Sequence, residues 1–142
     1  MLPLECMREL RASWLPNITD AGLRRLIELL EKSSPLLIHG SFSRAVPMGC
    51  LATHVAWNHP RTAHQTVDAG IGWLHHVAGL NPATSHVIRE WDRRGAQDWD
   101  MRADLIAVFQ EESQARQSTS AKPQAVPQGS DDPCCPVSSN PR

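Results

Sequence analysis

The sequence predicts an all-α fold: a compact bundle of about five helices followed by a disordered tail. Apolar residues recur at helical spacing in several segments, and prolines and glycines separate those segments. One short apolar run resembles a strand, but no second strand is evident to pair with it. A chain of 142 residues is long enough for one domain and a tail. We expect an α-helical domain at 1–117 and a tail rich in Pro, Ser and Gln at 118–142.

The amino-terminal third of the chain predicts two helices. Apolar residues four apart within 2–15 indicate a short helix that Pro16 ends. Thr19 or Asp20 is a suitable N-cap for a second helix, which ends before Pro35. Its predicted buried stripe, spaced i, i+3, i+4 and i+7, consists of Leu23, Leu26, Ile27 and Leu30.

The middle of the chain predicts a buried extended connection at 36–38 and then two further helices. The first begins near Pro47 and is ended by Pro60, and it carries no charged residue from Val46 to Trp57, as expected of a central helix buried on several sides. The second begins at Thr62, which has Gln65 at capping-box spacing. The stripe that this second helix would bury consists of Val67, Ile71, Leu74 and Ala78.

Glycines and cap residues predict the remaining boundaries. Gly79 suits the position just after a helix, and Asn81 and Pro82 suit the N-cap and first residue of the next one. Gly95 would end that helix, and Asp98 would cap the last one. The last helix has a predicted buried stripe of Met101, Leu105, Val108 and Phe109.

Charge and cysteine usage narrow the class of protein. The formal net charge of −1 produces no strong field toward nucleic acid or an anionic membrane. Charged residues interrupt the first ten positions, so we expect no secretory signal, no membrane partner and a cytoplasmic location. Cys6 and Cys50 are expected to be buried free thiols, and the adjacent Cys134 and Cys135 lie in the predicted tail.

Histidines are concentrated in one part of the chain. Of the seven, all but His39 lie between His54 and His86. A zinc or iron site is one interpretation, with Asp68 as an oxygen ligand. The other interpretation, which the absence of a paired helical motif such as HExxH favours, is a mixture of core and surface histidines. The candidate metal ligands are His54, His59, His64 and His76.

Residues 71–94 suggest a different function. Gly79 lies in a turn with an apolar residue after it, a helix start follows at 82–85, and a run ending in Arg93 and Arg94 comes next. This pattern resembles a helix-turn-helix of bacterial transcription regulators, over 24 of the 142 residues. The resemblance implies DNA as a partner. The residues that it would place in the major groove are Thr84, Ser85, His86 and Arg89.

The sequence contains no catalytic signature such as GxSxG or a Gly-rich phosphate loop, which favours a protein that is not an enzyme. It contains five tryptophans, of which Trp91 and Trp99 lie near predicted helix ends beside aspartates. Tryptophan is enriched at interface hot spots, so these two are candidate protein-interface residues. We therefore expect a small α-helical binding or regulatory module that acts through a protein partner without a cofactor. The two alternatives are a helix-turn-helix DNA-binding regulator and a His-rich metalloprotein that holds zinc or iron.

Overall fold

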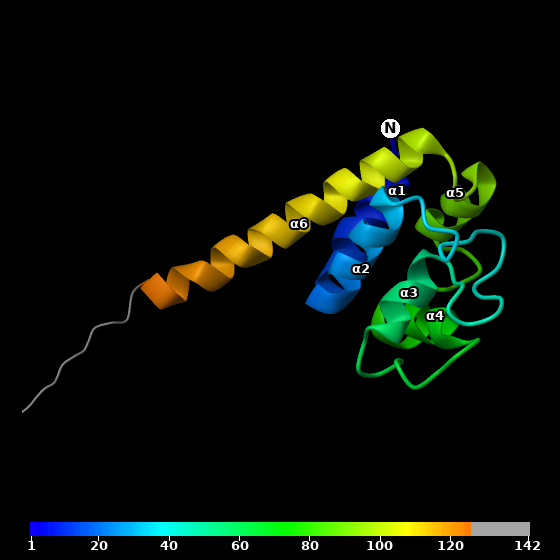
Figure 1. Cartoon of the computed structure of the whole chain (residues 1–142), viewed down its shortest axis with the longest axis horizontal. Helices are drawn as coiled ribbons and strands as arrows, with labels where there is room; N and C mark the ends of the chain where they lie inside the picture. The colour runs from blue at the N-terminus through cyan, green and yellow to red at the C-terminus, as the bar shows by residue number, and fades with distance from the viewer. Residues whose placement is uncertain (126–142) are drawn as a thin grey trace, which may run out of the picture. The chain divides into compact units, whose positions relative to one another are not determined.

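The computed structural model describes the backbone of residues 1–125 and the side chains of residues 1–119 (Figure 1). This part of the chain is helical and contains no strand, which confirms the all-α prediction. It divides into two units, Met1–Gln110 and a second unit that starts at Glu111. None of the described helices is long and apolar enough to cross a membrane. The elements are α1 (Leu4–Glu9), η1 (Leu10–Trp14), η2 (Leu15–Asn17), α2 (Asp20–Glu31), α3 (Leu51–Trp57), α4 (Ala69–Gly72), η3 (Trp73–Val77), α5 (His86–Arg94) and α6 (Trp99–Ala125).

The first unit has a single apolar core built from every helix in it. Trp14 and Trp73 lie at its centre, fully buried, with ring centroids 5.1 Å apart in an edge-to-face arrangement. The predicted apolar stripe of α2 and that of α6 both contribute to this core. Thr19 caps α2 as predicted, because its Oγ1 accepts a hydrogen bond from the Gly22 N–H at 3.0 Å.

The central helix begins later than the sequence predicts. We expected it to start near Pro47, whereas α3 starts at Leu51. Gly49 forms isolated β-bridges with Leu37 and Ser43, so its backbone is extended and pairs with the connection at 36–38. Those bridges compete with the first helical turn and shift the helix start by four residues.

The predicted helix from Thr62 to Ala78 is largely wrong in its first half. Residues 59–68 form turns, and the Thr62 hydroxyl donates to the Ala56 carbonyl at 2.7 Å instead of capping a helix. The predicted stripe is correspondingly wrong for Val67 and Ile71, which are 57% and 40% exposed. The helix that does form, α4 continued by the π-helical η3, passes very close to α3. A Cβ at Gly70 would lie 3.0 Å from the Thr53 backbone nitrogen, so only glycine permits this approach.

The start of α5 also differs from the prediction. Asn81 and Pro82 lie in a turn, and Ser85 is the N-cap, with its Oγ accepting from the Ile88 N–H at 3.3 Å. The predicted terminators are confirmed: Gly79 and Gly95 both have positive φ angles, of 71° and 92°.

The last helix begins as predicted, with Asp98 Oδ1 accepting from the Met101 N–H at 2.8 Å. It continues further than predicted, because α6 reaches Ala125 and so includes residues 118–125 of the expected tail. In the second unit, Arg116 pairs with Glu112 one turn before it at 2.7 Å, a spacing that supports the helix there. The rest of the predicted tail, with Cys134 and Cys135, lies outside the described residues.

Candidate functional site

An exposed tryptophan beside a small cavity is the strongest candidate for a functional surface. Trp99, the first residue of α6, is 76% exposed, whereas the buried stripe of the same helix faces the core. The indole therefore lies on the solvent side of the helix start.

The cavity beside Trp99 lies between the end of α2 and the start of α6, and has a volume of about 110 Å³. Arg102 forms its inner wall, because its guanidinium is buried and donates to the Leu30 carbonyl and the Ser33 hydroxyl. The same guanidinium carbon lies 5.9 Å from the Trp99 ring centroid, at the outer limit of a cation–π contact. We call this region the Trp99 surface; it consists of Leu30, Glu31, Ser33, Trp99, Arg102, Ala103 and Ile106.

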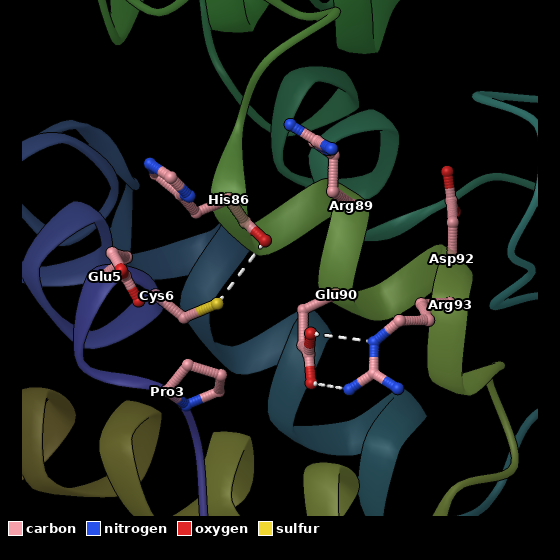
Figure 2. Close-up of a pocket in the computed structure, with 8 residues that line it drawn as sticks. All are labelled: Pro3, Glu5, Cys6, His86, Arg89, Glu90, Asp92 and Arg93. Carbon is pink, nitrogen blue, oxygen red and sulfur yellow. Dashed lines mark hydrogen bonds and ion pairs between the residues drawn. The ribbon is translucent and has the colours of Figure 1, made fainter.

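A second candidate is a wider cleft between α1 and α5, with a volume of about 720 Å³ (Figure 2). Most of its charged groups are already satisfied within the protein. Glu90 pairs with Arg93 and Arg94, each at 2.6 Å, and Asp92 accepts from the Gly40 N–H at 2.8 Å. The hydrogen bonds from Arg93 hold the pKa of the Glu90 carboxyl below its usual value. The cleft is lined by Pro3, Glu5, Cys6, His86, Arg89, Glu90, Asp92 and Arg93.

The thiol of this cleft is not activated as a nucleophile. Cys6 is 2% exposed and donates a hydrogen bond to the His86 carbonyl at 3.3 Å. Burial, together with the nearby Glu90 and Glu9 carboxylates, raises the pKa of Cys6 to about 11. Cys50 is also buried, and burial raises the pKa of its thiol. Both thiols are therefore protonated near neutral pH, and they are buried and free as predicted.

No protein-family model matches the sequence, and neither the curated proteins nor the solved structures contain a significant match.

The four histidines proposed as metal ligands do not come together. In the part of the chain whose side chains are described, no group of three or more His, Cys, Asp or Glu residues is placed to hold a metal ion. His54 is buried with Nε2 2.8 Å from the Leu36 carbonyl, and His59 Nδ1 accepts from the Arg61 N–H at 3.1 Å. His64 and His76 are exposed, and the ring of His76 stacks on that of His75.

His54 makes stability depend on pH. A carbonyl only accepts, so Nε2 carries the proton of the neutral ring, and burial lowers the pKa of this imidazole below 6.5. As the pH falls, the unfolded chain therefore takes up a proton on His54 before the folded protein does. The stability that the neutral His54 contributes is present above pH 6.5 and declines below it. The decline stops once the pH has passed the lower pKa of the folded protein.

We expect His54→Gln, which keeps an amide donor toward Leu36, to flatten this loss. Urea unfolding of both proteins at several values between about pH 8 and about pH 5 measures it. His59, whose pKa is also lowered by burial, is present in both proteins and cancels in the comparison. Parallel pH curves for the two proteins would show that His54 is not the titrating group.

The helix-turn-helix residues are placed differently from one another. Thr84, His86 and Arg89 are exposed: Thr84 lies just before α5, His86 is its first residue and Arg89 its fourth. Ser85 is 1% exposed and bonded to the Glu9 carboxylate at 2.5 Å, so its hydroxyl cannot reach a base edge. The connection between η3 and α5, residues 78–85, is also longer than the usual turn of three or four residues in this motif.

Trp91 is not an interface residue in this unit. It is fully buried, and its Nε1 donates to the Ile38 carbonyl at 2.8 Å. The prediction failed because Trp91 follows Val87 and Ile88 by one turn and shares their buried face, despite the aspartate beside it.

Two buried charged side chains, Glu9 and Arg102, were not predicted from the sequence. Glu9 is 8% exposed and Arg102 is 6% exposed, and each makes several hydrogen bonds in the interior. A signal for Glu9 was present: it follows Leu2 by seven residues, which places it on the buried face of the first helix. Arg102 comes directly after the buried Met101 and one helical turn after the exposed Trp99. The helical period alone therefore places Arg102 at the edge of the core.

Proposed function

We propose that this chain is a small helical module that binds another protein through the Trp99 surface. The single observation that supports it is the 76% exposure of Trp99 beside a small cavity with a mixed polar and apolar lining. A large side chain leaves most of its apolar area in water here, although the core buries Trp14, Trp73 and Trp91 completely. Covering such an indole in a complex is a common source of binding energy.

The other surfaces support this function less well. In the larger cleft Glu90 is paired with Arg93 and Arg94, Asp92 accepts from the Gly40 N–H, and the thiol is held protonated. DNA binding through α5 would rely on Thr84, His86 and Arg89 without Ser85, and Glu90 and Asp92 lie on the same short helix. The histidines are not assembled into a site in the described part of the chain.

Photo-crosslinking from the Trp99 surface tests the proposal. Ala103 is exposed and lines the cavity, so p-benzoylphenylalanine at this position would face a bound partner. In the source cells we expect light to convert the 15.7 kDa chain into a discrete heavier adduct, whose partner mass spectrometry identifies. Adding Trp99→Ala should reduce the adduct by at least about tenfold, as expected of a hot-spot residue worth about 2 kcal/mol.

A matched control is available at Ala63, which is also an exposed alanine but lies among the turns at 59–68. The same photoreactive residue at Ala63 should give no such adduct. Equal adducts from both positions, or an adduct from position 103 that survives Trp99→Ala, would contradict the proposed surface.

A further inference from the structure

His39 joins two connections that lie far apart in the sequence. Its Nδ1 accepts a hydrogen bond from the Ala96 N–H at 2.9 Å. A Cβ at Gly95 would lie 3.5 Å from the ring, so the imidazole packs directly against this glycine. Residues 95–98 link α5 to α6, and His39 directly follows the extended connection at 36–38. The imidazole therefore holds the link between the two helices against that connection.

The hydrogen bond exists for only one form of the ring. A backbone N–H can only donate, so Nδ1 is unprotonated and the neutral ring carries its proton on Nε2. In the protonated ring both nitrogens are donors, and Nδ1 can no longer accept. His39 is exposed and exchanges protons with water, whereas Ala96 is only 6% exposed. A proton on Nδ1 therefore takes the acceptor away from a buried N–H group, which costs free energy.

The other contacts at this place do not depend on the imidazole. Asp92 accepts from the Gly40 N–H at 2.8 Å, and the Trp91 indole donates to the Ile38 carbonyl at 2.8 Å. These two hydrogen bonds attach α5 itself to the segment that carries His39. The remaining charged side chains at the end of α5 and in the link pair with one another, and they are Glu90, Arg93, Arg94 and Asp98. Protonation of His39 thus acts on the link and not on α5.

We propose that His39 is a pH-sensitive switch for the link at 95–98. The neutral imidazole holds Ala96 in place, and protonation, which histidine side chains undergo between about pH 5 and 8, releases it. α5 stays attached through Trp91 and Asp92, so the released part is the short link that leads into Trp99. The switch requires no binding partner and stands apart from the function proposed above.

Nuclear magnetic resonance on the full ¹⁵N-labelled chain tests the inference. At about pH 8 we expect a scalar coupling between the Ala96 amide nitrogen and His39 Nδ1 across the hydrogen bond, and a neutral ring protonated at Nε2. At about pH 5 the coupling should disappear. The protection of the Ala96 N–H against hydrogen exchange should then fall about fivefold, as expected for the loss of one hydrogen bond of ordinary strength.

His39→Asn is the matched variant, because its side-chain oxygen accepts where Nδ1 does but does not titrate. We expect equal protection of Ala96 at both pH values in this variant. His59→Asn is the control: His59 Nδ1 also accepts from a backbone N–H, but that of Arg61 in the turns at 59–68. It should leave the pH response of Ala96 unchanged. A neutral His39 protonated at Nδ1, a response that persists in His39→Asn, or one that His59→Asn abolishes would each overturn the inference.

Discussion

Glu9→Ala is expected to lower the free energy of unfolding by about 3–5 kcal/mol, because it removes a buried carboxylate that accepts several hydrogen bonds. The Glu9 carboxylate accepts from four donors: the Trp14 indole at 2.9 Å, the Ser85 hydroxyl at 2.5 Å, and the N–H groups of His86 and Val87 at 2.8 and 3.3 Å. The two N–H groups belong to the first turn of α5, where no intrahelical acceptor exists. Alanine would leave these buried donors without a partner, and would also remove a negative charge from the positive end of the helix dipole.

Urea unfolding followed by far-ultraviolet circular dichroism measures this effect. Glu5→Ala is the matched control, because Glu5 belongs to the same helix but is exposed, and we expect it to change stability by less than about 0.5 kcal/mol. Glu9→Gln keeps the shape of the side chain and should cause a smaller loss than alanine, since one oxygen still accepts. A loss for Glu9→Ala no larger than that for Glu5→Ala would show that the carboxylate does not hold α5 in place.

Trp91→Ala is expected to destabilise the protein by about 3–5 kcal/mol, whereas Trp99→Ala should change stability by less than about 0.5 kcal/mol. Trp91 is fully buried, so alanine would create a cavity and leave the Ile38 carbonyl without its indole donor. Trp99 is 76% exposed and contributes little to the core. The same substitution in two tryptophans eight positions apart therefore separates stability from surface function.

Thermal and urea unfolding of both variants check this contrast, and the Trp99→Ala midpoint should stay within about 2 °C of the original. If Trp91→Ala yields too little folded protein, Trp91→Phe keeps most of the volume and isolates the lost hydrogen bond, at about 1–2 kcal/mol. A large loss of stability in Trp99→Ala would mean that this indole supports the fold, and the case for a binding surface would lose its main support.

The sequence by itself determined the helical class and those boundaries that local chemistry controls. Thr19 and Asp98 cap their helices because their side-chain oxygens reach N–H groups only three residues away. Gly79 and Gly95 end theirs because a left-handed backbone conformation favours glycine wherever it occurs. The buried stripes of α2 and α6 follow from the helical period over long, regular segments.

The tertiary structure determined those helix starts and buried faces that depend on residues far apart in the sequence. The start of α3 was set by bridges from Gly49 to Leu37 and Ser43, and the start of α5 by Glu9, 77 residues before His86. Trp91 and Trp99 have similar neighbours in sequence, yet one is buried and the other exposed, because burial depends on which face of the helix meets the core. A local pattern can specify a cap or a turn, but it carries no information about which distant group will supply the next hydrogen bond or cover the next apolar face.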